Sequence, residues 1–284
     1  MNNKFREKYG VIGDPISHSH SPEIHKLFAL QFNEKIDYES YHVTTKNLGK
    51  FIDNFRQNGG KGLNITLPHK IVAMDFVDKL SQNAIEAKAI NTIIFEDHAT
   101  IGDNTDGAGL ITDLCNNFKI EIKNKKILVL GAGGAARGII GPLIRQNPSH
   151  LEIANRSVTN AEIISKDLSG EFIIRTCDLE DLNKKESFDL IINAISFDAQ
   201  NNDIKLPKNI ISNSTMCYDL SYGASPTQFM LWAMKNDAEC AIQGWGMLIE
   251  QAAESYLLWK KIRPDTTEIL EQLDITSSSQ VLRR

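Results

Sequence analysis

Short apolar runs alternate with amphipathic stretches along most of this chain, and polar or glycine-rich residues follow many of the runs. Short runs bounded by turn residues predict strands, and apolar residues three or four positions apart predict helices. Because the two kinds of element alternate, we expect an α/β fold with a mostly parallel sheet in the first part of the chain. The strands expected there are 9–13, 38–43, 62–66 and 89–95, with 100–102 pairing back across Asp97-His98, and the helices are 22–32, 48–55, 71–80 and 107–118.

Two Ser-Pro pairs mark expected helix starts. Ser21 suits the N-cap position and Pro22 the first helical position, and Ser225-Pro226 repeats this signal before a helix at 229–234. The last long helix, 246–261, comes after the second part of the chain, and we expect it to cross back and pack on the first. The serine-rich tail from Thr276 is expected to be frayed.

A glycine cluster follows the apolar run 127–130. The spacing Gly131-x-Gly133-x-x-Ala136 fits the dinucleotide fingerprint, in which the first glycine makes a tight turn and the second admits a pyrophosphate. The helix that follows presents its N-terminus, which favours an anion. We therefore expect a doubly wound Rossmann domain, with further strands at 151–154, 172–176, 189–193, 216–220 and 240–242.

Length and composition narrow the class of protein. A chain of 284 residues, 42% hydrophobic and 24% charged, is typical of a globular protein with two domains. A net charge of −5 argues against nucleic acid as a partner. The four cysteines are widely spaced and predict reduced thiols in a cytoplasmic protein. The polar N-terminus lacks a signal-peptide core, and no stretch approaches the roughly 20 apolar residues that span a bilayer, so no membrane partner is expected.

Polar clusters follow several expected strands of the first part. In open α/β sheets, ligands bind beyond the carboxyl ends of the strands. These clusters are therefore expected to line one cleft that faces the nucleotide domain. They are residues 17–21, 64–70, 91–92 and 104–106.

These clusters contain sequence blocks that resemble those of the shikimate dehydrogenase family. The blocks occur in the family's order and span nearly the whole chain, as His18–Pro22, Asn64–Lys70, Ala89–Thr92, Gly102–Gly107, Gly131–Arg137, Asn155–Ser157 and Gly246–Ala253. The resemblance implies reversible NADPH-dependent reduction of 3-dehydroshikimate to shikimate, a step in aromatic amino-acid and chorismate biosynthesis.

The resemblance also implies that Lys70 is the general acid and base, paired with Asp106. These residue types suit the reaction, because hydride addition to a ketone builds negative charge on oxygen, which a lysine ammonium stabilises and protonates. Taken alone, without the resemblance, Lys70 is by default interpreted as a solvated surface lysine, and Asp106 is compatible with a turn residue. The family's matching serines and tyrosine hold the substrate carboxylate, and its amides and threonine hold the ring hydroxyls; the implied residues are Ser19, Ser21, Tyr222, Asn64, Thr66, Asn91 and Gln251.

The second strand of the nucleotide domain indicates NADP as the cofactor. NAD enzymes tend to carry an acidic residue at its end, whereas Asn155-Arg156-Ser157 offers an arginine to a 2′-phosphate. Many relatives have a second basic residue where this chain has Asn160, so tolerance of NAD stays open. The chain also departs from the family at 193–197 and 243–245, near the expected nicotinamide pocket. The implied cofactor-binding residues are Gly131, Ala132, Gly133, Gly134, Ala135, Asn155, Arg156, Ser157, Asn193, Ala194, Gly244 and Met247.

The expected organisation is a substrate-binding domain over residues 1–106, completed by helices within 246–284, and a Rossmann NADP-binding domain over 107–245. We expect a monomer or homodimer. No metal site is expected, because His18, His20 and His25 cluster without an ordered ligand spacing. Two alternatives remain open, namely a quinate/shikimate dehydrogenase that uses NAD and a non-catalytic NADP-binding regulatory protein of the same fold.

Overall fold

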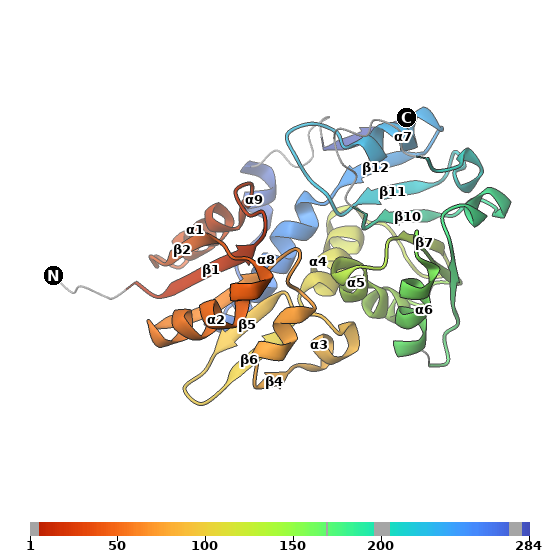
Figure 1. Cartoon of the computed structure of the whole chain (residues 1–284). Coiled ribbons are helices and arrows are strands. Elements are labelled where there is room, and N and C mark those ends of the chain that lie inside the picture. The colour runs from red at the N-terminus through yellow and green to blue at the C-terminus, as the bar shows by residue number, and fades with distance from the viewer. Residues whose placement is uncertain (1–5, 169, 196–204, 273–279) are drawn as a thin grey trace.

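The computed structural model describes residues 6–168, 170–195, 205–272 and 280–284. Its strands form two sheets, and helices pack on both faces of each (Figure 1). Within these residues, no helix combines the length and the apolar character that crossing a membrane requires.

Six strands form the first sheet: β1 (Lys8–Gly13), β2 (Asp37–His42), β3 (Gly60–Ile65), β4 (Lys79–Leu80), β5 (Thr92–Phe95) and β6 (Thr100–Asp103). Their order is β2-β1-β3-β5-β6-β4. β1 runs parallel to β2 and β3, and β4 runs parallel to β6, while β5 is antiparallel to both of its neighbours. The predicted α/β fold with a mostly parallel first sheet is confirmed, and so is the hairpin between β5 and β6.

Helices cover both faces of this sheet. On one face, Phe28 and Tyr256 pack against Tyr9 of β1, and on the other, Leu48 packs with Ile12. The first face carries α1 (Ser21–Gln31), α8 (Trp245–Lys260) and α9 (Thr267–Gln272), and the second carries α2 (Leu48–Gln57), a 3-10 helix (Val72–Phe76) and α3 (Gln82–Ala87).

Seven strands form the second sheet: β7 (Lys126–Leu130), β8 (His150–Ala154), β9 (Ile174–Cys177), β10 (Leu190–Asn193), β11 (Met216–Asp219), β12 (Cys240–Gln243) and β13 (Val281–Arg283). Their order is β13-β12-β11-β10-β7-β8-β9, and within the described part of this sheet only the pair β12–β13 is antiparallel. The chain winds outward from β7 to β9 and then returns to β10 on the other side of β7. The doubly wound prediction is confirmed, and the switch point between β7 and β10 is where such sheets bind dinucleotides.

Buried clusters hold helices against both faces of the second sheet. Leu110, Ile139 and Ala161 pack on one face, and Phe229 packs on the other. The first face carries α4 (Asp106–Thr112), which continues as a π-helix (Asp113–Asn117), together with α5 (Gly134–Arg145) and α6 (Val158–Asp167), while α7 (Gln228–Lys235) lies on the second face.

Helix α8 links the two sheets. Near its start, Met247 belongs to the core of the second sheet, and near its end, Tyr256 belongs to the core of the first. Along its length it packs against α4 and α1 (Figure 1). The prediction that the last long helix crosses back to the first part of the chain is confirmed.

Several local predictions are wrong. Residues 71–80 do not form one helix, because the short 3-10 helix ends at Phe76 and β4 joins the sheet beside β6. Helix α7 begins after Thr227, whose hydroxyl accepts the N–H of Met230, so Ser225-Pro226 is not its start. The tail is not frayed over Val281–Arg283, which pair with β12; residues 276–279 lie outside the described part of the chain.

Candidate active site

Lys70 lies in a turn that hydrogen bonds of the adjacent residue and of its own backbone hold in place. Buried His69 donates from Nε2 to the carbonyl of Val43 at 2.6 Å, and the N–H of Ile90 donates to the carbonyl of Lys70 at 2.8 Å. The side chain of Lys70 is 12% exposed, and its Nζ lies 2.5 Å from Oδ2 of Asp106, which is 4% exposed. The two residues predicted as a catalytic pair thus form a mostly buried ion pair beyond the end of β3.

Asp106 is held through its backbone and through its second carboxylate oxygen. Its N–H donates to Oδ1 of Asn104 at 3.1 Å, and Oδ1 of Asp106 accepts from Nδ2 of Asn91 at 2.8 Å. Since Lys70 donates to the other oxygen, both oxygens of this carboxylate have a donor. The carboxylate therefore has a fixed orientation toward Lys70.

Five buried polar side chains, which we call the amide cluster, lie beside this pair. Each is at most 6% exposed, and each is hydrogen-bonded to at least two of the others through its side-chain amide or hydroxyl. The five residues are Asn64, Asn91, Thr92, Thr105 and Ser255. Asn64 and Asn91 were predicted as substrate-binding residues, but Ser255 was not predicted. It lies one helical turn after Gln251 on α8, and that spacing is the signal that points to it.

Ser19, the first predicted serine of the carboxylate site, contacts the backbone at the start of α1. Ser21 is the first residue of α1 and not its N-cap, and the N–H of Ser21 donates to Oγ of Ser19 at 3.3 Å. The prediction that Ser21 caps the helix is therefore wrong, because His20 occupies the N-cap position and no side chain caps α1. Ser19 is half-buried, while Ser21 is buried.

Tyr38, which was not predicted, supports the amide cluster. Burial raises the pKa of Tyr38, so its hydroxyl stays protonated, and it donates to Oδ1 of Asn64 at 2.7 Å. Buried His25 stacks on Tyr38 with 4.4 Å between ring centroids. Burial lowers the pKa of His25 to about 3, so this histidine is neutral at neutral pH.

An aromatic group brings Tyr222 close to the start of α1. The ring centroids of Tyr222 and Trp245 are 4.8 Å apart, and His20 lies 4.7 Å from Trp245 and 6.2 Å from Tyr222. Tyr222 follows β11, so the second sheet contributes this residue to the region of Ser19 and Ser21. Trp245, at a position noted above as departing from the family pattern, contacts both of the other two rings.

The other predicted substrate residues differ in their contacts. Gln251 accepts from Nδ2 of Asn91 at 3.1 Å through Oε1 and donates from Nε2 to the carbonyl of Leu248 at 2.7 Å. Thr66 is half-buried after β3, and its carbonyl accepts from the N–H of His69 at 2.9 Å, which closes the turn before Lys70.

The glycine loop, residues 131–135, lies at the switch point of the second sheet. Gly131 has a φ of +104°, and a side chain there would meet the backbone of Ala194 at 3.1 Å. A side chain on Gly133 would point into open space, and α5 begins directly after it with no side-chain cap. The loop therefore offers open backbone and a helix N-terminus to an anion, which fits a dinucleotide pyrophosphate.

The start of helix α5 lies against the ion pair of Lys70 and Asp106. A Cβ on Gly134 would lie 3.1 Å from Cβ of Lys70, and one on Gly138 would lie 3.1 Å from Oδ2 of Asp106. Helix α5 can thus approach both residues only because these two positions lack a side chain. The contact brings the nucleotide half of the molecule against the ion pair.

The residues predicted to select NADP lie after β8. Arg156 and Ser157 are exposed, and Nδ2 of Asn155 donates to the carbonyl of Ser157 at 2.9 Å. Asn160, at the position that departs from the family, is exposed as well. This turn offers a guanidinium and a hydroxyl at the surface, which fits a phosphate group.

The remaining predicted cofactor residues are buried or half-buried. Nδ2 of Asn193 donates to Asp219 at 2.9 Å and to the carbonyl of Ile195 at 3.0 Å, so Asn193 shapes the loop that holds Ala194. Gly244 precedes α8, and a side chain there would collide with the carbonyl oxygens of Asp219 and Leu220. Ser196 and Phe197, which complete the segment 193–197 that departs from the family pattern, lie outside the described residues.

A buried carboxylate supports the start of α8 and with it Met247. The hydroxyl of Tyr218 donates to Oδ2 of Asp113 at 2.5 Å and accepts from the N–H of Met247 at 3.3 Å. Asn117 donates to the other oxygen of Asp113 at 2.8 Å. Burial raises the pKa of Asp113 to about 6, and a side chain on Gly246 would collide with this carboxylate.

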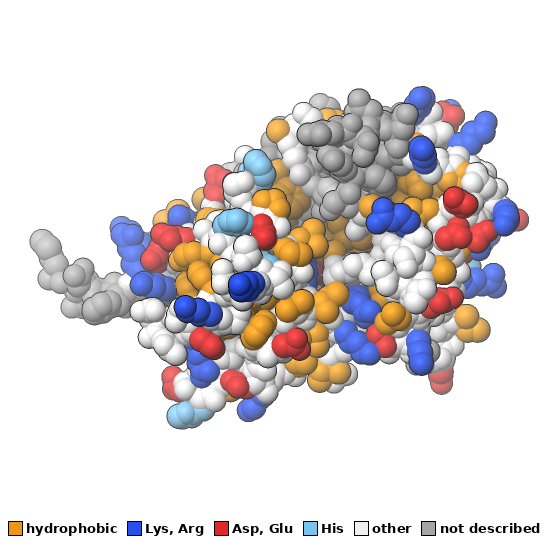
Figure 2. Space-filling view, viewed as in Figure 1, with side chains coloured by type: hydrophobic (Ala, Val, Ile, Leu, Met, Phe, Trp, Pro, Cys, Tyr) orange, Lys and Arg blue, Asp and Glu red, His pale blue; other side chains and the backbone are white. Residues whose placement is uncertain are grey.

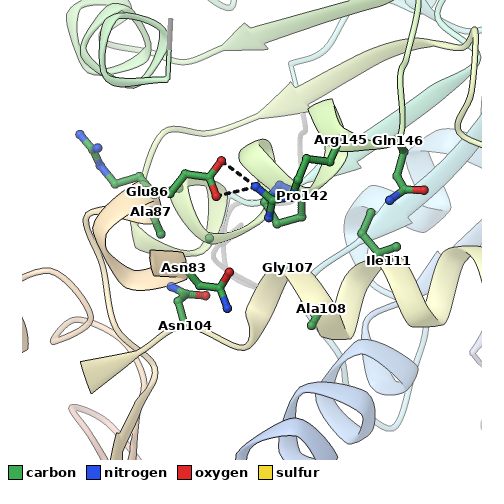
Figure 3. Close-up of a pocket in the computed structure, with 12 residues that line it drawn as sticks. Asn83, Glu86, Ala87, Asn104, Gly107, Ala108, Ile111, Pro142, Arg145 and Gln146 are labelled. Carbon is green, nitrogen blue, oxygen red and sulfur yellow. Dashed lines mark hydrogen bonds and ion pairs between the residues drawn. The ribbon is translucent and has the colours of Figure 1, made fainter. Parts of the chain in front are cut away.

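A cavity of about 200 Å³ lies behind Asn104, between α3, α4 and α5. Figure 3 shows Glu86 of α3 pointing toward Arg145 of α5 at its edge, where both carboxylate oxygens accept from Nη1 at 2.7 and 2.6 Å. A second set of ion pairs joins Asp167 to Lys88 at 2.6 Å and to Arg137 at 3.1 Å. These charges tie the first sheet's helix α3 to the second sheet's helices.

Charges of both signs are interspersed on the face of the molecule seen in Figure 2. Basic side chains do not gather into one stripe on this face.

Fold and site together define a class of enzyme, an α/β oxidoreductase in which one sheet presents a mostly buried lysine–aspartate ion pair and the other a dinucleotide loop. Residues 11–93 match the family model of the shikimate dehydrogenase substrate binding domain, and residues 113–220 match that of shikimate / quinate 5-dehydrogenase. The chain belongs to the shikimate dehydrogenase family.

Individual relatives cover nearly the whole chain. The chain is 43% identical to the shikimate dehydrogenase (NADP(+)) of Nitrosococcus oceani over 94% of its own length and 95% of that protein's. An Ael1 enzyme from Pseudomonas putida superposes with a TM-score of 0.85, 37% identity and coverage of 94% and 98% of the two chains. The Thermus thermophilus shikimate 5-dehydrogenase, solved with NADP(H) and shikimate, has a TM-score of 0.82, 27% identity and coverage of 93% and 97%.

Proposed function

We propose that this chain catalyses the reversible NADP-dependent reduction of 3-dehydroshikimate to shikimate, a step of the shikimate pathway toward chorismate and the aromatic amino acids. The observation that carries the proposal is the ion pair of Lys70 and Asp106, 2.5 Å apart, directly beside the glycine loop. Residues 1–106 with α8 and α9 bind the substrate, and the second sheet binds the cofactor. The enzyme is cytoplasmic and acts as a monomer or homodimer.

Lys70 is the general acid in the reducing direction. When bound, NADPH supplies a hydride to the substrate's carbonyl carbon. The ammonium of Lys70 stabilises the negative charge that develops on the carbonyl oxygen and donates a proton to it. In the oxidising direction the neutral amine of Lys70 takes that proton back. Asp106 holds Nζ in place by a charge-assisted hydrogen bond.

Neutral polar groups bind the parts of the substrate that do not react. Asn64, Asn91, Thr66 and Gln251 hydrogen-bond the ring hydroxyls. Side-chain amides and hydroxyls can hydrogen-bond the hydroxyls of the substrate. An analogue that lacks one of these hydroxyls leaves a buried polar group of the site without a partner, so the site rejects it. Ser19, Ser21 and Tyr222 bind the carboxylate at the start of α1, where a helix N-terminus favours an anion.

The cofactor is held by backbone at one end and by side chains at the other. Residues 131–135 bind the pyrophosphate, and Asn155, Arg156 and Ser157 bind the 2′-phosphate end. The nicotinamide lies among Asn193, Ala194, Gly244 and Met247.

The test is turnover of shikimate and quinate with NADP and with NAD, followed by NADPH or NADH absorbance. We expect the largest kcat/KM for shikimate with NADP. A preference for quinate or for NAD would replace the proposal by a quinate/shikimate dehydrogenase. Binding of NADP in calorimetry without turnover of either substrate would identify a non-catalytic protein instead.

A further inference from the structure

Ser255 lies at the junction of the amide cluster. Its side chain is fully buried on α8, and its Oγ lies 2.9 Å from Nδ2 of Asn64, 2.7 Å from Oγ1 of Thr92 and 3.3 Å from Oγ1 of Thr105. The backbone carbonyl of Gln251 is 3.1 Å away. One hydroxyl thus joins residues of β3, of β5 and of the loop before α4.

The hydrogen-bond partners fix the orientation of the Asn64 amide. A backbone carbonyl only accepts, so the carbonyl of Asn91, at 3.2 Å, must face Nδ2 of Asn64. The hydroxyl of Tyr38 donates to Oδ1 on the other side. Nδ2 of Asn64 therefore faces Ser255, whose oxygen accepts its second hydrogen.

The same accounting orients the Asn91 amide. The N–H of Thr105 donates to Oδ1 of Asn91 at 2.9 Å, so Nδ2 of Asn91 faces Asp106. The hydroxyl of Thr92 also donates to Oδ1 of Asn91, at 2.9 Å. Oγ1 of Thr92 also lies 2.7 Å from Oγ of Ser255, and the hydroxyl of Ser255 donates to the backbone carbonyl of Gln251 at 3.1 Å.

We propose that Ser255 is a positioning residue that determines specificity for the ring hydroxyls, by accepting from Nδ2 of Asn64 and so fixing the orientation of that amide. This inference rests on the proposed function, in which Asn64 and Asn91 bind those hydroxyls. Ser255 is fully buried, so it acts through these side chains. Without the hydroxyl of Ser255, Asn64 loses its shortest acceptor, and Thr92 loses a hydrogen-bond partner at 2.7 Å. Partly satisfied buried polar networks lose their fixed geometry.

The test compares shikimate with an analogue that lacks one non-reacting ring hydroxyl. In Ser255→Ala, we expect KM for shikimate to rise about tenfold, because one buried hydrogen-bond donor loses its acceptor. The ratio of kcat/KM for shikimate to kcat/KM for the analogue should fall by a similar factor, while KM for NADP stays unchanged. A purely structural role would lower both kcat/KM values equally and leave their ratio intact.

Two further variants complete the experiment. Ser255→Cys preserves the size of the side chain but makes only weak hydrogen bonds, so it should move the ratio in the same direction even if Ser255→Ala folds poorly. Thr266→Val removes a different buried hydroxyl, which bonds Glu250, and should leave the ratio unchanged. An unchanged ratio in both Ser255 variants would overturn the assignment. Failure of the unaltered chain to turn over shikimate would overturn the proposed function, and this assignment with it.

Discussion

At the carboxyl edge of the first sheet, Asn64, Asn91 and Thr92 are almost fully buried and bond to one another through their side chains. At the carboxyl edge of the second sheet, Gly133 and Arg156 are exposed, and Gly133 faces open space. The first edge has its polar groups oriented by other side chains before any ligand arrives. The second offers open backbone and a surface guanidinium.

This difference matches what each edge is proposed to recognise. A hydroxylated ring presents several donors and acceptors in fixed directions, so amides oriented by their neighbours discriminate among analogues. A pyrophosphate presents charge in many directions, and open N–H groups at a helix N-terminus suffice for it. Substitutions at the first edge should therefore change chemistry and stability, whereas those at the second should change affinity alone.

The largest effect is expected from Lys70→Ala at the first edge. We expect kcat for shikimate oxidation to fall about a thousandfold, because the variant has no group to exchange the proton or stabilise charge on oxygen. KM should change much less, since Lys70 acts in the transition state. Steady-state kinetics with NADP measures both quantities.

Lys50→Ala on the exposed side of α2 is the matched control and should behave like the unaltered chain. If Lys70→Ala raised only KM, the lysine would be a binding residue. Substitutions at the two sheet edges would then both change affinity, and the expected difference between the edges would be absent.

The next effect is expected where the two edges meet, at Asp113 beneath the start of α8. Burial raises the pKa of Asp113 to about 6 from the ordinary 3.8. Between these values the folded chain holds a proton that the unfolded chain has released, so this group's contribution makes folding less favourable as pH rises through the window. The difference corresponds to up to about 3 kcal/mol.

Asp113→Asn removes this contribution. We expect the free energy of unfolding of the unaltered chain to lose up to about 3 kcal/mol more than that of the variant between about pH 4 and about pH 7. Urea unfolding at the two pH values measures the loss. Asp97→Asn, in the exposed turn between β5 and β6, is the control. An equal loss in Asp113→Asn and the unaltered chain would show that the carboxylate is charged throughout the window.

Local signals in the sequence predicted the second edge well. The turn at Gly131, the start of α5 and the polar turn after β8 each depend on a few neighbouring residues. The glycine spacing alone therefore predicted the loop's position and its open backbone at Gly133. Predicting that the loop binds a dinucleotide also required the strand before it and the helix after it.

The first edge was predictable only in part. The resemblance indicated Lys70 and Asp106, and the structure brings them together. The amide cluster depends on contacts between distant segments, since Asn64 and Ser255 are 191 residues apart in the chain. Residues 71–80 show the same limit, because pairing with β6 draws Lys79–Leu80 into the sheet despite their helical spacing.

The smallest effect is expected at the second edge, from Arg156→Gln. This side chain is exposed after β8, so its loss should leave the melting temperature unchanged. Removing a charged partner of the 2′-phosphate should weaken NADP binding about tenfold and leave NAD binding unaffected, because NAD lacks that phosphate. Calorimetry with each cofactor measures the two affinities.

Arg175→Gln is the matched control, since Arg175 is an exposed arginine on the neighbouring strand β9. An equal loss of NADP and NAD affinity in Arg156→Gln would mean that the arginine acts through general charge and not through the 2′-phosphate. A lowered melting temperature would mean that the second edge, too, is held together by its side chains. If Arg156→Gln weakens NADP binding alone and leaves the melting temperature unchanged, the two edges differ as expected. Substitution at the open edge then lowers cofactor affinity without lowering the stability of the fold.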